Sequence, residues 1–246
     1  MKGVDYMKGR TKKLIQTYLV LLLLVFTWFG GAFKVMAKSS PRVIVIDPAF
    51  QEVADDSKEP VGPGAFRTSA EASSGNVGAT TGYPEYELTL QVALKLKADL
   101  ENAGYEVILT RSSNDVNISN SGRAMIANMF DADLFIVVSA KEDGNGSSGV
   151  QVVCQSEDNP YNYGNYEDGR LLSDTILGSV KAAGSRARLV EDDDMAVMNW
   201  CQAPSTVVEI GSLANEDEEE KLLNVDYQQE LADGIAAGVD SYFTQR

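Results

Sequence analysis

The sequence predicts a single α/β domain built on a mostly parallel, twisted sheet with helices on both faces. Short apolar runs rich in valine and isoleucine recur along the chain, and amphipathic stretches of helical length separate them. Parallel strands need crossover connections of this kind, usually helices. A sheet with this architecture places its binding site at the carboxyl ends of its strands.

The first expected strand covers residues 42–47, a short apolar run that ends in Asp47. An amphipathic helix is expected over residues 87–103, where Gly104 supplies the stop signal. Its buried stripe consists of residues at helical spacing: Leu88, Val92, Leu96 and Leu100. The alternation then continues with a strand at 105–110, a helix at 119–130 and a strand at 133–139.

The second half of the chain repeats this rhythm. Strands are expected at 149–155, 187–190, 196–198 and 205–210, and helices at 169–183, 216–223 and 227–243.

Residues 51–82 break the alternation, because they are rich in Gly, Pro and Ser and have almost no apolar periodicity. They predict a long loop. Since the segment directly follows the first strand, we expect it to lie over the site.

Residues 1–37 have the features of an export segment. Basic residues at 8–13 precede an apolar run at 18–29, and Val35-Met36-Ala37 has the small-residue pattern of a cleavage site. Residues 14–33 are also long enough to span a bilayer, so a signal peptide and an uncleaved membrane anchor both remain open. Either one places residues 38–246 outside the cytoplasm, because the positive charge stays inside.

The charge balance excludes some partners. The chain holds 36 acidic and 21 basic residues, a net charge of −15, and six of the basic residues fall in the first 37 positions. An acidic domain of this kind is repelled by nucleic acid and by anionic lipid headgroups.

The two cysteines lie beside expected strands. Cys154 ends one strand-like run and Cys201 precedes another. In an oxidising compartment they are predicted to form a disulfide, with two free buried thiols as the alternative.

Two acidic runs resemble metal sites only superficially. Residues 216–220 follow Asn215, an expected helix N-cap, so their carboxylates fit ordinary capping. Residues 191–194 lack the Gly turn and the bidentate glutamate of a calcium loop. Both runs are expected to be solvated.

A third cluster, Tyr161, Tyr163 and Tyr166, has two interpretations. Tyrosine rings present apolar faces with a polar tip, which suits a sugar-binding platform. Packing within a loop is the alternative.

Several phrases of this sequence follow one another in a set order. They are Val45-Ile46-Asp47-Pro48, Glu85 to Leu90, Leu94 to Lys97, Gly104 to Val107, Thr110-Arg111, Arg123 with Ala127-Asn128, Ala132 to Ile136, Pro204 to Gly211, and Leu213 to Asn215. Together they resemble the zinc-dependent N-acetylmuramoyl-L-alanine amidases (amidase family 3), which cleave peptidoglycan. The resemblance covers residues 41–244 and implies the zinc amidase fold, a phosphorylase/hydrolase-like α/β fold.

The resemblance also implies which positions carry the family's chemistry. Two zinc-binding histidines map to Phe50 and Ser139, the zinc-binding glutamate maps to Glu85, and the catalytic acid/base maps to Glu209. The chain contains no histidine at all. Because zinc needs several ligands in a near-tetrahedral set, we expect no bound zinc and no hydrolysis. Glu85 and Glu209 would then be a helix-start residue and a strand-end carboxylate.

Two further positions differ from the family pattern. Ala49 replaces a glycine in the turn, which adds a Cβ, and Lys141 replaces an asparagine. Side chains two apart on a strand face the same way, so Lys141 is expected to point with Ser139 toward the site. Its ammonium is a candidate substitute for the missing metal cation.

These observations predict an exported amidase-like protein that binds peptidoglycan or regulates a cell-wall protein, with membrane attachment if residues 1–37 are retained. One alternative is an active amidase whose metal is held by Glu85, Glu209 and either Glu52 or Asp55. Another is a structural or interaction module without glycan binding.

Overall fold

The structure, a computed structural model, describes residues 41–141 and 148–246. The predicted export segment, residues 1–37, lies outside the described residues. Within the ranges described, no helix has the length and apolar character needed to cross a membrane.

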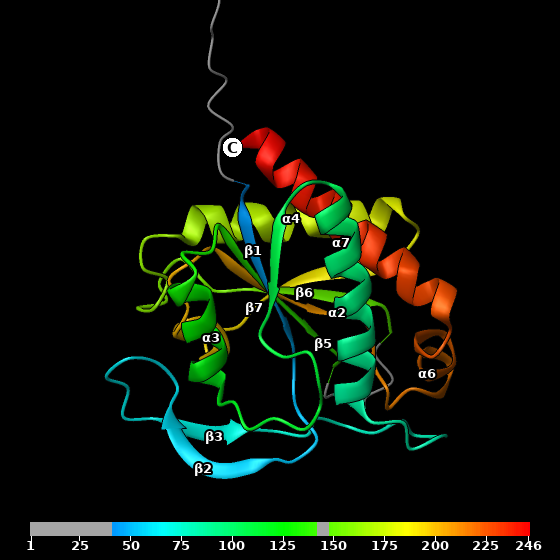
Figure 1. Cartoon of the computed structure of the whole chain (residues 1–246), viewed down its shortest axis with the longest axis horizontal. Helices are drawn as coiled ribbons and strands as arrows, with labels where there is room; N and C mark the ends of the chain where they lie inside the picture. The colour runs from blue at the N-terminus through cyan, green and yellow to red at the C-terminus, as the bar shows by residue number, and fades with distance from the viewer. Residues whose placement is uncertain (1–40, 142–147) are drawn as a thin grey trace, which may run out of the picture. The chain divides into compact units, whose positions relative to one another are not determined.

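A six-stranded sheet forms the centre of the domain (Figure 1). Its strands are, in spatial order, β4 (Glu106–Leu109), β1 (Val43–Pro48), β5 (Leu134–Ser139), β8 (Ser205–Glu209), β6 (Val150–Cys154) and β7 (Ala187–Glu191). The first four are mutually parallel, whereas β6 runs antiparallel to β8 and parallel to β7. The prediction of a mostly parallel sheet is therefore confirmed.

Helices cover both faces of this sheet, because successive strand residues point to opposite sides. Ile44 and Ile46 of β1 pack in the core formed with α2 (Glu85–Asn102), α4 (Tyr166–Ala182) and α7 (Val225–Gln245). Val45 packs in a second core with α3 (Asn120–Met129) and α5 (Ala196–Asn199).

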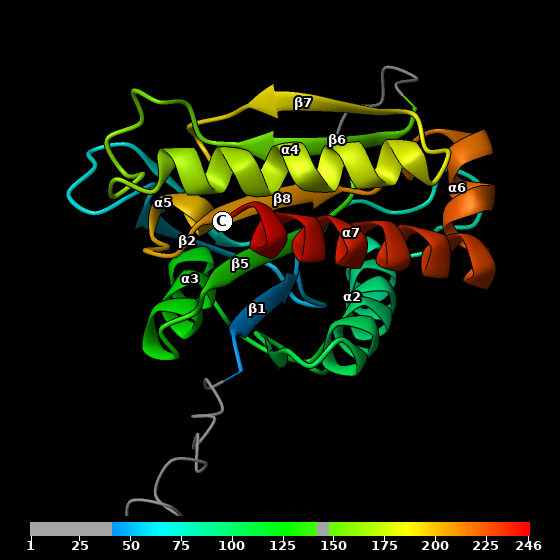
Figure 2. The same cartoon turned by 90° about the horizontal axis from the view of Figure 1, so that it is seen from above.

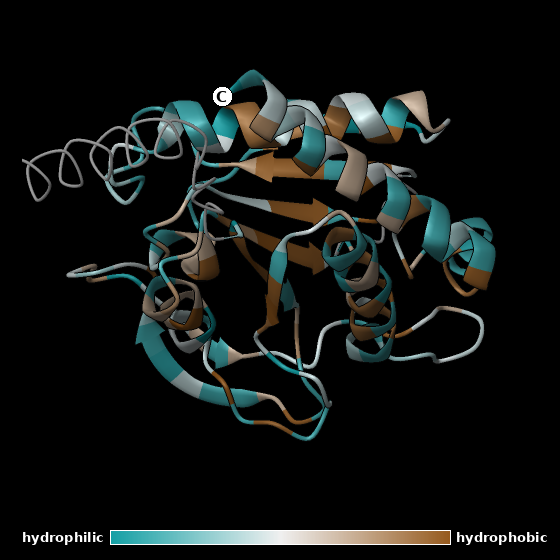
Figure 3. Ribbon diagram, turned by 45° about the horizontal axis from the view of Figure 1, so that its top comes forward, coloured by the Kyte–Doolittle hydropathy of each residue, from teal (hydrophilic) through white to brown (hydrophobic). Residues whose placement is uncertain are grey.

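Figure 2 shows α4 and α7 side by side, and they are in contact. In Figure 3 the strands at the centre of the six-stranded sheet are mostly hydrophobic, and more hydrophilic helix surfaces flank them. The short α6 (Glu216–Leu222) precedes α7.

Residues 196–198 form part of a helix, so the prediction of a strand there is wrong. The amides of Met198 and Asn199 both donate to the carbonyl of Met195, which closes a single helical turn. Three apolar residues in a row do not distinguish a buried strand from a buried helical turn.

The predicted loop at 51–82 contains a β-hairpin instead, made of β2 (Asp55–Pro60) and β3 (Thr68–Ala72). Their sequences, DDSKEP and TSAEA, are polar and mostly exposed on β2, so they carry no hydrophobic alternation. Contacts distant in sequence hold the hairpin. Glu59 accepts from the Ser121 amide at the start of α3, and the Trp200 indole donates to the Pro60 carbonyl at 2.9 Å.

Candidate functional site

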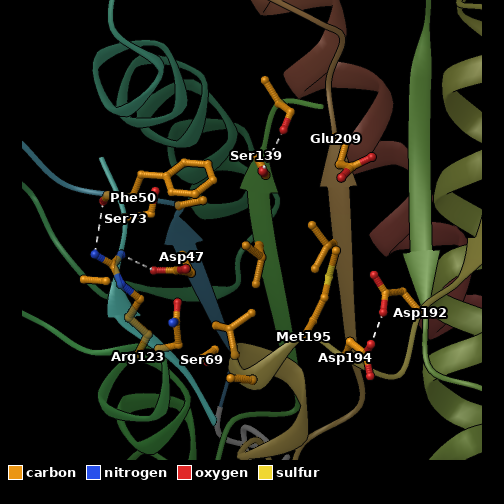
Figure 4. Close-up of a pocket in the computed structure, with 18 of the residues that line it drawn as sticks. Asp47, Phe50, Ser69, Ser73, Arg123, Ser139, Asp192, Asp194, Met195 and Glu209 are labelled. Atoms are coloured by element: carbon orange, nitrogen blue, oxygen red, sulfur yellow. Dashed lines mark hydrogen bonds and ion pairs between the residues drawn. The ribbon is translucent and has the colours of Figure 1, made fainter. Parts of the chain in front are cut away.

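A cavity of about 540 Å³ lies over the face of the sheet near the ends of β1, β5 and β8 (Figure 4). Its floor includes Val137 and Val207, and α3 contributes Asn120 and Arg123. The hairpin forms a further wall, so the segment expected over the site does line it. The hairpin and the segment after β7 contribute Ser69, Ala70, Ala72, Ser73, Asp192, Asp194, Met195, Ala196 and Val197.

The turn after β1 is held by Arg123. This buried guanidinium pairs with Asp47 at 2.8 Å and donates to the carbonyls of Pro48 and Phe50, both at 3.1 Å. It also donates to the Gln51 side chain at 2.9 Å. One side chain therefore fixes the conformation of the turn that carries position 50.

Arg111 supports the same turn from the other side. It donates to the carbonyls of Pro48 at 2.8 Å and Ala49 at 3.1 Å, and to that of Tyr86 in α2 at 2.8 Å. Burial lowers the pKa of Arg111 to about 10, and the nearby Arg123 contributes in the same direction. The roles of both arginines were not predicted, since their phrases indicated only the family resemblance.

Phe50 occupies the left-handed region of backbone conformation, with φ of 68°. Figure 4 shows its ring directed from the turn toward the end of β5. A Cβ on Gly75 would lie 2.9 Å from both a ring carbon of Phe50 and a carboxylate oxygen of Glu85, so positions 50 and 85 meet at Gly75. Ala49 is not in the left-handed region, so the Cβ that it adds at the family's glycine position causes no strain of that kind.

Glu85 is the first residue of α2 and is fully buried. Its Oε2 accepts from the backbone N of Asn76 at 2.9 Å and from the Asn76 side chain at 3.3 Å. Its Oε1 accepts from the backbone N of Ala140 at 2.7 Å. The carboxylate thus ties the loop before α2 to the end of β5, a role that neither helix capping nor the resemblance predicted.

Ser139 and Glu209 are register partners at the ends of β5 and β8, and both line the cavity (Figure 4). The Ser139 hydroxyl donates to the Ala140 carbonyl at 3.1 Å. Lys141 is buried and lines the same cavity, with its backbone N bonded to Gly211 O at 2.8 Å. The expected orientation of Lys141 is consistent with this position, whereas its role as a cation substitute stays a prediction.

The residues at the family's ligand positions do not fit zinc. Phe50 has no donor atom, and Ser139 offers a neutral hydroxyl where an imidazole belongs. Glu85 alone is a suitable ligand. A single carboxylate does not fix a zinc ion.

The alternative carboxylate ligand set is not assembled. Asp55 bonds to Ser57 and Asn117 on the hairpin side, Glu52 is exposed, and neither residue lines the cavity. Across residues 41–141 and 148–246, no three His, Cys, Asp or Glu side chains lie together as a possible metal site.

The first acidic run is solvated only in part, because Glu218 and Glu219 are buried while its other three members are exposed as expected. Glu219 is buried and accepts from the backbone N atoms of Thr80 at 2.7 Å and Thr81 at 2.9 Å, while Glu218 accepts from Gly149 N at 2.8 Å. Burial alone would raise the pKa of Glu219, but these bonds hold it below its usual value. The predicted N-cap is confirmed, since the Asn215 side chain accepts from Glu218 N.

The second acidic run also makes specific contacts. Asp194 pairs with Arg67 of the hairpin, with one Nη1–Oδ2 distance of 2.7 Å, and Asp193 accepts from Ser156 and Asn159. Asp192 and Asp194 line the cavity, which sequence reasoning missed. The polar sequence of this run gave no indication that Asp194 pairs with Arg67, which is 127 residues away in the sequence.

The cysteines are both free and buried, so the predicted disulfide is wrong. Cys154 ends β6 with its thiol toward the Val190 carbonyl, and the Cys201 thiol lies toward the Ala203 carbonyl. The prediction was wrong because a disulfide needs the two side chains to point toward each other, and the sequence alone does not show that direction.

We expect neither thiol to react with an aromatic disulfide reagent in the native protein at pH 8. Burial raises the pKa of Cys154 to about 11 and that of Cys201 to about 12, so the reactive thiolate is scarce. Spectrophotometric titration should count no thiols before denaturation and two afterwards. Mass spectrometry that finds the two residues linked in the unreduced protein would contradict the structure.

The sequence is similar to proteins of one known family. The profile of a family described as N-acetylmuramoyl-L-alanine amidase matches residues 44–241. The uncharacterized protein YqiI of Bacillus subtilis is 31% identical over 172 residues, covering 70% of this chain and 80% of that protein. An N-acetylmuramoyl-L-alanine amidase of Mycobacterium tuberculosis is 25% identical over 224 residues, covering 87% of this chain and 91% of its own.

Solved structures show the same fold. The amidase Ami1 of Mycobacterium smegmatis superposes with a TM-score of 0.76 and 21% identity, over 83% of this chain and 98% of that chain. The mostly parallel sheet covered by helices is thus the architecture that the resemblance implied.

Proposed function

Because the chain belongs to the N-acetylmuramoyl-L-alanine amidase family, we propose that it acts outside the cytoplasm, where it binds peptidoglycan without hydrolysing it. One observation carries this proposal. The family's glutamate positions, Glu85 and Glu209, are kept at the site, while the two histidine positions are Phe50 and Ser139. A site of this composition retains a shaped cavity and has lost the donors for the metal.

The cavity has the properties of a ligand site. Its volume of about 540 Å³ lies within the range of ordinary ligand pockets, and an apolar floor is bordered by a few polar groups. The hydroxyl of Ser69 is buried there without a hydrogen-bond partner in the described structure. A ligand amide or hydroxyl that bonded to Ser69 would remove the cost of leaving that group unsatisfied.

Hydrogen bonds hold part of the cavity lining and its surroundings in place, which favours binding. Arg111 and Arg123 fix the turn at 47–51, and Glu85 fixes the loop at 75–76 against β5. A preformed wall reduces the ordering cost that a ligand would otherwise bear. Residues 1–37 support the proposed location, as a signal peptide or as an anchor to the cytoplasmic membrane.

The proposal is tested by metal analysis, a peptidoglycan gel assay and sedimentation with isolated sacculi. We expect no stoichiometric zinc, no clearing of the gel, and sedimentation with the sacculi. Ala70→Trp should fill the cavity and weaken binding at least about tenfold, whereas Met129→Trp, on the exposed surface of α3, should leave binding unchanged.

Each outcome decides a part of the proposal. A zinc-to-protein ratio near one together with wall lysis would overturn the inactive assignment and favour a hydrolase. A chain that stays in the supernatant with sacculi would overturn peptidoglycan binding and leave a structural or protein-interaction role.

A further inference from the structure

Aromatic side chains gather around the turn that joins β2 and β3. The members of this aromatic surface are Phe66, Tyr161, Tyr163 and Trp200. Phe66 belongs to the turn and is fully exposed, whereas the other three come from the segments after β6 and at the end of α5. Figure 2 shows the connection between β2 and β3 extending on the side where α5 lies.

Close contacts bring these elements together. The Tyr161 ring lies against Gly62 so tightly that a Cβ at position 62 would be 2.7 Å from its Cζ atom. The indole of Trp200 donates to the carbonyl of Pro60, which precedes Gly62 by two residues. The Tyr163 hydroxyl donates to the carbonyl of Asn199, which neighbours Trp200. Tyr161 and Tyr163 are therefore packed within a loop, as one interpretation predicted, whereas Tyr166 is the first residue of α4. Tyr161 packs directly against the turn.

The backbone that carries the aromatic surface is held in place before any ligand binds. The turn is closed by Val61 N to Arg67 O at 3.1 Å and by Ala65 N to Gly62 O at 3.0 Å. The segment that carries the tyrosines is fixed by the buried Asn159, which accepts from Tyr161 N at 2.8 Å. The rings of Tyr161, Tyr163 and Trp200, which these contacts hold, lose little entropy when a ligand covers them.

Tyr163 is exposed on 43% of its surface although its hydroxyl is engaged. Phe66 exposes an entire apolar ring, a costly arrangement in water. Rings with an accessible face and a fixed polar tip fit the apolar C–H faces of sugars and leave the sugar hydroxyls in water.

The acidic residues around the aromatic surface disfavour anionic polymers as ligands. The nearby segments carry Glu157, Asp158, Asp193 and Asp194, and Arg67 is already paired with Asp194. Carboxylates repel phosphate polymers and anionic membranes but accept hydrogen bonds from sugar hydroxyls. An uncharged glycan is the polymer that this surface accommodates.

The aromatic surface is continuous with the cavity. β3 lines the cavity through Ser69, Ala70 and Ala72, and Asp194 lines it while pairing with Arg67 at the edge of the turn. A glycan on the aromatic surface would therefore lie beside the cavity mouth, where an attached peptide has access to the cavity.

We propose that this aromatic surface binds the glycan strand of peptidoglycan by stacking, while the cavity takes the attached peptide. This proposal rests on the proposed function. It further specifies which part of peptidoglycan each of the two regions recognises. The aromatic surface differs from the cavity in its proposed ligand and in its residues, so the two regions can be tested separately.

The test measures binding of the full chain to two probes. One is sacculus glycan strands freed of peptides, with their lactyl carboxylates converted to the neutral methyl amide so that the strand stays uncharged, and the other is free stem peptides. Phe66→Ser with Tyr163→Ser should weaken glycan binding at least about tenfold and leave peptide binding unchanged. Met129→Ser with Val225→Ser removes comparably exposed apolar groups elsewhere, 74% and 63% exposed, and should change neither. Ala70→Trp should weaken peptide binding alone.

A second measurement does not depend on these variants. Glycan strands should change the fluorescence of Trp200 in a Trp28→Phe protein, and Tyr163→Phe, which keeps the ring, should still bind. Equal glycan binding by the double variant and the parent chain would overturn the inference, as would preference for a polyphosphate probe. If sacculi bind but glycan strands do not, the inference fails and the proposed function stands. If sacculi do not bind, the proposed function itself fails.

Discussion

Replacement of Arg123 by methionine is expected to lower the free energy of unfolding by about 3 to 5 kcal/mol. The guanidinium and its partner Asp47 are both buried. The substitution therefore leaves an interior carboxylate that, among the described residues, keeps the Thr110 hydroxyl as its donor. The carbonyls of Pro48 and Phe50 lose a donor as well. Methionine keeps much of the side-chain volume, so loss of the polar contacts dominates the effect.

Urea denaturation of the parent and variant chains measures the change. Arg170→Met is the matched control, because Arg170 pairs with Asp174 and Glu191 on the exposed side of α4. Such surface pairs contribute about 0 to 1 kcal/mol. Adding Asp47→Asn to Arg123→Met should recover part of the loss, since it removes the isolated charge. A loss below about 1 kcal/mol would mean that Arg123 does not hold the turn as the structure indicates.

Much of the fold was predictable because burial on both faces leaves a clear pattern. β1 and β5 are continuous apolar runs, and the α2 stripe of Leu88, Val92, Leu96 and Leu100 is buried as expected. The hairpin was missed because its strands are polar and its stability comes from contacts with α3, α5 and the segment after β7. Contacts of that kind leave no local period in the sequence.

The site was predictable only in part, for a similar reason. The family phrases located Phe50, Glu85, Ser139 and Glu209 at strand and helix ends, where the topology of a parallel sheet gathers side chains. The contacts of Asn76 and Ala140 with Glu85 depend on a loop conformation that no spacing rule specifies. The buried thiols and the buried Glu219 show the same limit, because side-chain direction decides their surroundings.

The retained geometry leads to the second large expected effect: Phe50→His, Ser139→His and Lys141→Asn together should create a zinc site. Glu85 is oriented by hydrogen bonds to both oxygens, as metal-binding carboxylates usually are. Histidine accepts the left-handed conformation of position 50 more readily than phenylalanine does. Ala49→Gly, which the resemblance suggested, is not required, since residue 49 is not left-handed.

Zinc binding should return before catalysis. Three ligands suffice to bind zinc at about micromolar free metal, whereas hydrolysis also needs second-shell partners that fix each imidazole. Lys141→Asn should improve both properties, because an ammonium in the same cavity repels the metal.

Equilibrium dialysis against a zinc buffer measures the uptake, and the thermal unfolding midpoint should rise with zinc in the triple variant but not in the parent chain. Glu85→Gln in the triple variant is the control, because it keeps the shape of the site and weakens the third ligand. Zinc uptake that survives Glu85→Gln would mean that the metal binds elsewhere on the acidic surface. A folded triple variant that takes up no zinc would mean that the positions of Phe50 and Ser139 have diverged from the metal-binding arrangement, and that Glu85 now serves only to join α2 to β5.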